Sequence, residues 1–570
     1  MAHIAVDNIK KRTFDAIVIG SGISGGWAAK ELTKHGLQTL VLERGRNVNH
    51  VTDYPTTMLM PWELEHRGQI PLKLKEEYKI ASKNYIFSEE TAHFLTKDKE
   101  QEYIQDKPYD WIRAYQMGGR SLIWGRQTQR WSDFDFEGPA RDGFSIDWAI
   151  RYKDIAPWYD YVEKFAGISG NKDGLDVLPD GHFLPPHEMT CVEKHFKQKI
   201  ADKYKNRHVI IGRAAHLTEP QQIHYDQGRA KCLNRDMCAR GCPYGGYFSS
   251  NSSTLPWAAK TKKMTFRPHS VVESILYDEQ KRKAVGVRII DAITNESIEY
   301  FAKIIFVTAS ALGSNQILLN SRSNRFPNGL GNDNGLLGKF MAFHNYRGKI
   351  SAKYDGFLDS TTDGRRPNGS YMPRFRNVLK QETDFLRGYA SGLYSSRPLI
   401  DNQDGLGETL KENVLKSELG IWHISSNMMG ETIPKENSTV KLDTNLTDKY
   451  GIPQLRISVG YDENDEKMLK DFFEQFTEMY QEAGFNDIKT TDTKRNPGNE
   501  NHEMGGIRMG KDAKTSLLNS WNQLHTCKNV FVTDGACMTS TSTQNPSLTY
   551  MALTARAVDY AVKQLKKLQL

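Results

Sequence analysis

The chain has 570 residues, of which 38% are hydrophobic and 25% charged, the usual balance of a folded globular protein rather than a disordered one. Its formal net charge of +7 is spread along the sequence, and no dense lysine–arginine block indicates a nucleic-acid surface. No stretch approaches the roughly 20 apolar residues of a membrane helix, so we expect neither nucleic-acid binding nor a transmembrane segment.

The N-terminus begins with a polar stretch, Met1 to Lys10, followed by a short apolar run, Ala16 to Ile19. That run is a strand inside a motif rather than the core of a signal peptide, so we expect no export signal here.

Residues 14–43 have the pattern strand, glycine turn, helix, strand. The turn reads Gly20-Ser21-Gly22-Ile23-Ser24-Gly25 and fits the dinucleotide fingerprint, with Gly20, Gly22, Ser24 and Gly25 as candidate binding positions. Glu43 ends the next strand, where a carboxylate binds ribose hydroxyls, and Arg44 follows it. The pattern predicts dinucleotide binding but leaves FAD and NAD open.

The hydrophobic pattern of the sequence changes in the middle of the chain. Helical patterns cover 148–165 and 189–204, and short strands such as 285–290 and 304–308 precede a helix from Ser314. Period-two strands follow from about 346 to 458, then an amphipathic helix at 463–483, and the last seventy residues are again glycine-rich. We predict an α/β nucleotide-binding domain at 1–345, with 47–110 partly in the substrate lobe and a cysteine loop at 228–248. An inserted antiparallel-sheet substrate domain spans 346–495, and 496–570 return to the first domain.

Three C-terminal segments carry a family resemblance: His502 to Gly510, Val530 to Gly535, and Asn545 to Thr549. They resemble the glucose–methanol–choline (GMC) oxidoreductases, whose fold is a Rossmann-like FAD-binding domain with an inserted antiparallel-sheet domain. The resemblance implies FAD and assigns the catalytic pair to His502 and Asn545. It places Asp534 near the flavin ribityl and pyrophosphate, and residues 334–344 also match. Further implied cofactor positions are Gly118, Gly119, Ser121, Trp124, Val272 and Thr549.

The catalytic pair suits alcohol oxidation. A neutral histidine can accept the hydroxyl proton near neutral pH, and an asparagine amide can donate to the developing alkoxide. His344 and His525 have no such pairing in the sequence, so we predict structural roles for both. Residues 119–131 contain no histidine that could attach the flavin, so we expect non-covalent FAD.

Three of the six cysteines lie close together: Cys232, Cys238 and Cys242, followed by Pro243. The spacing favours an iron–sulfur cluster over zinc, because no histidine or fourth cysteine is nearby in the sequence; metal-free thiols remain the alternative. The pattern resembles the three-cysteine catalytic subunits of bacterial FAD glucose dehydrogenases and glucoside 3-dehydrogenases, which implies a 3Fe–4S cluster. We predict that Cys191, Cys527 and Cys537 are packing residues.

The resemblance implies a dehydrogenase that oxidises a sugar or glycoside at a ring secondary hydroxyl, with the 3-position favoured. It further implies a small accessory subunit, a cytochrome-type acceptor and co-export to the periplasm, with a cytoplasmic enzyme as the alternative. In the substrate lobe we expect sugar contacts from polar and aromatic residues, including Tyr394, Trp422, His423 and Asn427. The rival functions are an oxygen-using enzyme resembling pyranose oxidase and a non-redox flavin-dependent lyase.

Overall fold

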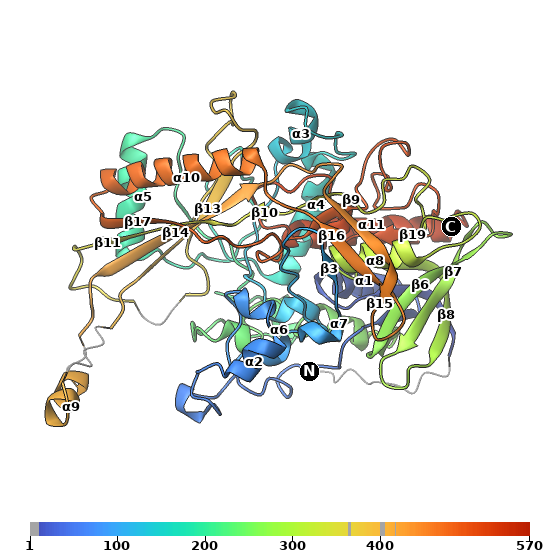
Figure 1. Ribbon diagram of the computed structural model, residues 1–570, viewed down its shortest axis with the longest axis horizontal. Coiled ribbons are helices and arrows are strands. Elements are labelled where there is room, and N and C mark those ends of the chain that lie inside the picture. Colours follow the sequence, from blue (N-terminus) through green and yellow to red (C-terminus); the bar gives the residue numbers. More distant parts are fainter. Residues whose placement is uncertain (1–10, 363–365, 400–404, 416–417) are drawn as a thin grey trace.

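The computed structural model describes residues 11–362, 366–399, 405–415 and 418–570 and has two sheet-containing parts side by side (Figure 1). The polar first ten residues, where we expect no export signal, lie outside the described residues. Within the described ranges, no helix is long and apolar enough to span a membrane.

The first part is built on a seven-stranded sheet in the order β5-β2-β1-β8-β7-β6, with β19 paired to β8. Strands β1, β2, β5, β8 and β19 are parallel, and β7 is antiparallel to both β8 and β6. The central strands are continuous apolar runs because helices cover both faces. The bounds are β1 (Thr13–Ile19), β2 (Thr39–Leu42), β5 (Met264–Arg267), β6 (Ser270–Asp278), β7 (Lys283–Asp291), β8 (Ser297–Val307) and β19 (Val530–Val532).

Helix α1 (Ile23–Lys34) follows β1 and packs against α7 (Thr254–Lys260) and the C-terminal helix α11 (Ser547–Lys566). Helix α8 (Ala311–Asn320) follows β8, as the sequence predicts. The last segment of the chain therefore completes the first domain. The remaining helices of this part are α2 (Leu72–Glu77), α3 (Asp133–Arg141), α4 (Tyr152–Ala166) and α6 (Gln222–Asp226).

The second part is an antiparallel sheet in the order β17-β11-β14-β13-β12-β4, with β10 paired to β14. Helices α5 (Cys191–Lys203) and α10 (Glu463–Glu482) contribute Phe196 and Phe472 to the buried cluster of this sheet (Figure 1). The bounds are β4 (Ile210–Ile211), β10 (His344–Asn345), β11 (Gly348–Tyr354), β12 (Ser370–Met372), β13 (Tyr389–Ser396), β14 (Trp422–Glu431) and β17 (Asn486–Asp492). A further helix, α9 (Glu408–Leu415), lies away from the rest of the molecule in this view (Figure 1). The Rossmann-like domain with an inserted antiparallel sheet is confirmed.

The segments of the two parts alternate along the chain more often than the predicted domain boundaries indicate. Helix α5 and strand β4 join the second sheet although they precede residue 346, because β4 pairs with β12. Residues 48–95 share an apolar cluster with the first sheet, through Val48 and Phe94. Tyr85 from the same segment interacts with Tyr346 and Tyr394 of the second part. Two small sheets join distant segments: β15 (Thr439–Thr447), β16 (Pro453–Ser458) and β3 (Ile104–Gln105), and β9 (Lys339–Ala342) with β18 (Met504–Gly506).

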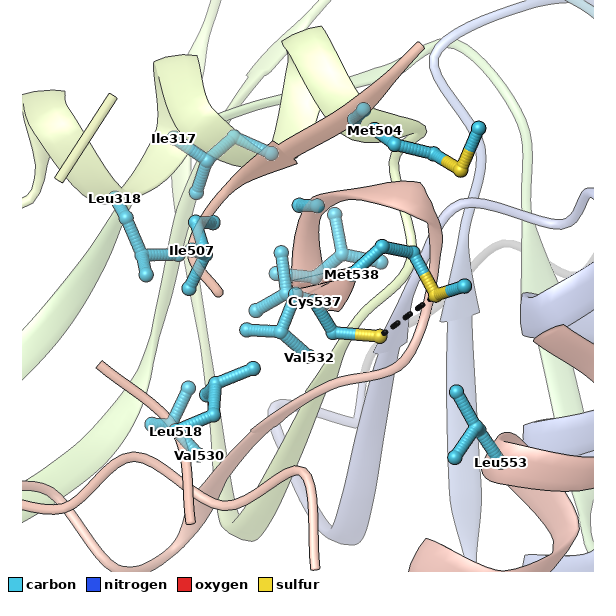
Figure 2. Close-up of a cluster of buried hydrophobic side chains, with 14 of the residues drawn as sticks. Ile317, Leu318, Met504, Ile507, Leu518, Val530, Val532, Cys537, Met538 and Leu553 are labelled. Carbon is cyan, nitrogen blue, oxygen red and sulfur yellow. Dashed lines mark hydrogen bonds between the residues drawn. The ribbon is translucent and has the colours of Figure 1, made fainter. Parts of the chain in front are cut away.

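An apolar cluster anchors the segments that carry the C-terminal motifs. Figure 2 shows Ile507, Val532 and Cys537 packed together with Ile317 and Leu318 of α8. Cys537 is fully buried, and its thiol lies 3.9 Å from the Met538 sulfur (Figure 2). Cys537 is therefore a packing residue, as the sequence predicts.

Candidate active site and cysteine pocket

A long pocket opens where β1 and β2 end and α1 begins, the place where open α/β sheets bind ligands. Glycine is required in its floor. Gly20 has φ +93°, and a Cβ there would lie 2.6 Å from the Thr308 carbonyl oxygen. A Cβ on Gly25 would lie 1.9 Å from the Gly20 oxygen, so helix and strand can approach only without a side chain.

The N-terminus of α1 faces this pocket without a partner of its own. Its N-cap residue, Gly22, provides no side-chain hydrogen bond, and the first turn contains no acidic residue. The unpaired N–H groups and the positive end of the helix dipole are thus left for an anion such as a pyrophosphate.

Two buried carboxyl groups also line the pocket. Glu43 ends β2, and its Oε2 accepts from the Ser21 backbone N–H at 3.1 Å. Burial raises the pKa of Glu43. Asp534 follows β19, accepts from the Ala536 backbone N–H at 2.9 Å, and has its pKa raised to about 6 by burial. Both carboxyl groups are fixed by hydrogen bonds, Glu43 also from the Ser21 hydroxyl and Asp534 also from the Ser314 hydroxyl. Carboxylates at these positions suit the ribose and ribityl hydroxyls of a dinucleotide.

Most of the predicted cofactor residues line this pocket. They are Gly20, Gly22, Ser24, Glu43, Arg44, Gly119, Ser121, Trp124, Val272 and Asp534. Gly25, Gly118 and Thr549 do not. Gly118 donates to Ser21 Oγ at 3.0 Å and so supports the loop, whereas Thr549 Oγ1 lies 2.8 Å from Tyr159 Oη. Tyr550, the next residue, lines the pocket instead.

The pocket contains buried polar atoms that have no hydrogen-bond partner within the described part of the chain. These are Gln101 Oε1, Glu500 Oε2 and Asn501 Oδ1. Buried polar groups are normally hydrogen-bonded, so these atoms indicate a polar ligand. Together with the open helix terminus and the glycine floor, they fit a bound FAD.

His502 and Asn545 lie side by side at this same pocket, with His502 Nε2 3.3 Å from Asn545 Nδ2. Burial, with a further contribution from His344 and Arg120, holds the pKa of His502 well below its ordinary value. The imidazole is therefore neutral at neutral pH and able to accept a proton. The sequence-predicted pair is thus brought together by the fold.

His344 is also part of this arrangement, contrary to our expectation of a peripheral role. Its Nδ1 lies 2.8 Å from Nδ1 of His502, and it is fully buried. The only sequence signal was its place at the end of the family-like segment 334–344. His525, by contrast, bonds to Ser516 at 3.0 Å and does not line the pocket.

Sequence reasoning also missed Arg120, Glu500 and Glu503. Glu503 is paired with Arg120 through contacts of 2.7 and 3.1 Å, next to His502. Burial raises the pKa of Glu500 to about 8, which keeps this pocket-lining carboxyl protonated at neutral pH. Glu503 and Arg120 adjoin predicted site residues in the sequence, but nothing in the local pattern pairs the two charges with each other.

None of the four expected sugar contacts, Tyr394, Trp422, His423 and Asn427, is among the described residues that line this pocket. Trp422 is buried in the substrate-sheet core and donates to the Phe357 carbonyl at 3.0 Å, so it is a packing residue, whereas His423 is exposed on β14. Tyr394 interacts with Tyr85, which does line the pocket, as do Arg126 and Gln127.

The three clustered cysteines line a second, smaller pocket. Burial raises the pKa of Cys232 to about 11 and also raises that of Cys238. Among the described residues, no three His, Cys, Asp or Glu side chains are close enough to hold one metal ion. The fold adds a histidine that the local sequence lacks: His216 lines the pocket, and its Nε2 lies 3.8 Å from Cys238 Sγ.

Two arginines lie near this second pocket. Arg229 is fully buried and bonds only to carbonyl groups and to Gln227, and in the described chain no carboxylate pairs with it. Burial lowers its pKa to about 9, and the nearby Cys242 opposes that shift. Arg126 lines the first pocket, and its guanidinium carbon lies 5.4 Å from the centre of the Tyr247 ring, which lines the cysteine pocket. A side chain from each pocket is therefore in contact with one from the other.

Comparisons with known proteins agree with this geometry. A 2-methyl-1,2-propanediol dehydrogenase of Mycolicibacterium austroafricanum is 28% identical over 96% of this chain and 94% of its own length. The fructose dehydrogenase large subunit of Gluconobacter japonicus is 23% identical over 97% and 98%. The crystal structure of pyridoxine 4-oxidase from Mesorbium loti has the same fold, with a TM-score of 0.58 and 14% identity over 96% of this chain and 99% of that one.

Family models described as GMC oxidoreductase match residues 56–344 and 434–554. The family binds FAD, and the relatives act on CH–OH donors, as the resemblance implied. These matches cover more than half of the sequence and agree with the FAD-fitting pocket, so the chain belongs to the GMC oxidoreductase family.

Proposed function

We propose that this chain is an FAD-dependent dehydrogenase that oxidises a secondary hydroxyl of a sugar or glycoside, with the 3-position favoured. Electrons then pass through an iron–sulfur cluster at Cys232, Cys238 and Cys242 to a protein acceptor. The observation that carries the proposal is the placement of His502 and Asn545 in the pocket that fits FAD.

His502 and Asn545 have different roles in the oxidation of the alcohol. FAD held in this pocket would supply the hydride acceptor that turns the alcohol carbon into a carbonyl carbon. Nε2 of His502 takes the hydroxyl proton, since the neutral imidazole has a free lone pair. The Asn545 amide, 3.3 Å away, donates to the oxygen as it gains negative charge.

The cysteine pocket supports the cluster assignment. Three thiols converge on one small pocket without forming a site for a single ion, and each iron of a cluster can take one thiolate. A cluster held by three thiolates is an anion, and Arg126 and Arg229 supply nearby positive charge. The contact between Arg126 of the first pocket and Tyr247 of the cysteine pocket supports a short path for electrons away from the flavin.

One relative's name bears on a partner subunit, whereas the electron acceptor and the compartment are proposals of our own. The name of the fructose dehydrogenase relative, a large subunit, supports a small accessory subunit for this chain. With it we propose a cytochrome-type acceptor and a periplasmic complex exported with the partner. Copurification of a small protein and iron from the periplasmic fraction is expected; an iron-free protein purified alone from the cytoplasm would contradict this part.

The position of oxidation is tested with methyl glucoside, in which carbon 1 is blocked and the 3-hydroxyl is free. We expect it to reduce the bound flavin and to yield a 3-keto product by NMR. Reduction by glucose but not by methyl glucoside would move the reaction to carbon 1. Rapid peroxide formation in air, with no iron bound, would favour the pyranose-oxidase-like alternative.

A further inference from the structure

We infer that His344 fixes the tautomer of His502, so that the nitrogen facing the pocket is always the one without a proton. The inference rests on the proposed role of His502 as proton acceptor and adds a positioning residue to it.

The hydrogen-bond partners of His344 determine where its proton lies. Its Nε2 faces two backbone carbonyl oxygens, of Ser542 at 3.0 Å and of Thr541 at 3.4 Å. Carbonyl oxygens only accept, so Nε2 of His344 must carry a hydrogen. Burial lowers the pKa of His344 to about 4, which leaves the ring neutral with a single proton. Its Nδ1 is therefore a bare acceptor.

The tautomer of His502 follows from that of His344. Nδ1 of His344 and Nδ1 of His502 are 2.8 Å apart, a distance that requires one hydrogen between the two nitrogens. Because Nδ1 of His344 has none, His502 carries it on Nδ1. His502 is neutral as well, so its Nε2 is free of hydrogen and faces Asn545. The other tautomer would set two bare nitrogens against each other and present an N–H to the substrate hydroxyl.

A buried network of ion pairs and hydrogen bonds fixes Ser542, whose carbonyl oxygen faces His344. Ser542 has φ 61°, a left-handed conformation that needs support, and its Oγ donates to Asp135 at 2.8 Å. Arg374 donates to the same Oγ at 3.0 Å and also pairs with Glu431. Glu431 lies opposite His344 in the β10–β14 pair. The substrate sheet thus fixes Ser542 and, through it, both imidazole rings.

Two substitutions separate this role from simple packing, because each preserves one half of the imidazole. His344→Asn places an amide oxygen near the Nδ1 position, where it can accept from His502. His344→Gln places an amide N–H near the Nε2 position, where it can donate to Ser542, and leaves His502 without an acceptor. The limiting rate of flavin reduction is measured by anaerobic stopped flow with the fastest of glucose, methyl glucoside, fructose and 2-methyl-1,2-propanediol.

We expect the limiting rate of the Asn variant to exceed that of the Gln variant at least about tenfold. The substrate concentration that gives half-maximal rate should change little, and both variants should retain FAD. Equal rates, or a faster Gln variant, would overturn the inference. Should neither variant fold, ¹⁵N-histidine NMR of the unaltered holoenzyme decides, with the His502 signals identified by their loss in His502→Ala. Protonation of His502 on Nδ1 supports the inference, and protonation on Nε2 overturns it. Because the NMR result needs no turnover, failure of the proposed function is distinguishable from failure of this inference.

Discussion

Nε2 of His216 lies 3.8 Å from the Sγ atom of Cys238, although 22 residues separate them in the chain. His216 is fully buried, and among the described residues its Nδ1 has no hydrogen-bond partner. The imidazole therefore presents Nε2 to the cysteine pocket, where it can donate to a Cys238 thiolate that binds a cluster. Hydrogen bonds to cluster sulfurs raise reduction potentials because they stabilise the more negative, reduced form.

His216→Leu is expected to keep the iron content and to lower the midpoint potential of the cluster, since the donor to Cys238 is lost. A redox titration followed by electron paramagnetic resonance measures the potential. An unchanged potential with full iron content would show that His216 does not act on the cluster.

Cys232→Ser, Cys238→Ser and Cys242→Ser are each expected to lose iron and to slow turnover with a protein electron acceptor. Flavin reduction by substrate should persist, because the hydride step precedes the cluster. Cys191→Ser, in α5 and outside the cysteine pocket, is the matched control and should keep its iron. Iron content equal to the control in all three variants would remove the cluster from the account.

His502→Ala is expected to reduce the rate of flavin reduction by about 10²–10⁴-fold, because the proton acceptor is lost. FAD should remain bound, since the α1 terminus, Glu43 and Asp534 are untouched. Asn545→Ala should be milder. Stopped-flow absorbance gives the rates, and full activity in the His502 variant would refute the assignment.

FAD is expected to be bound non-covalently. Among the described residues that line the large pocket, His502 is the only histidine, and no cysteine is present. Acid precipitation should therefore release the yellow colour into the supernatant. Flavin that stays with the pellet would contradict this expectation.

The unaltered enzyme is expected to lose activity at alkaline pH, and Glu500→Gln is expected to abolish that loss. The pKa of Glu500 is raised to about 8, so the carboxyl is protonated below that pH and becomes a carboxylate above it, beside Glu503. Gln mimics the protonated form at every pH. Rates of flavin reduction from about pH 6 to about pH 9 should match near pH 7 and diverge above about pH 8. Identical profiles for the two proteins would exclude this role.

The parts of the site that could be predicted from sequence are those that contiguous motifs encode. Gly20 to Gly25 directly follow a strand and open a helix, and His502 and Asn545 each lie within a recognisable segment. His344 could not be paired with His502 because 158 residues separate them and the contact depends on the antiparallel pairing of β9 with β18, in which Ala342 lies opposite Met504.

The fold shows the same limit. Strand β1 and helix α10 were predictable because their apolar periodicity is long, whereas β4 has only two residues and no periodic signal. Its assignment to the substrate sheet depends on pairing with β12 far along the chain. The aromatic residues of β14 were misassigned because alternation predicts a buried face but not whether that face lines a pocket or a core.

The central claim is tested most directly by anaerobic addition of sugars to the oxidised holoenzyme while the flavin absorbance is recorded. The panel is glucose, methyl glucoside, fructose and 2-methyl-1,2-propanediol, with His502→Ala as the control. The account predicts rapid bleaching by at least one sugar or glycoside, and its loss in the control. A flavin that stays oxidised with every sugar and glycoside, whether or not the diol bleaches it, would contradict the assignment of this chain as a sugar dehydrogenase.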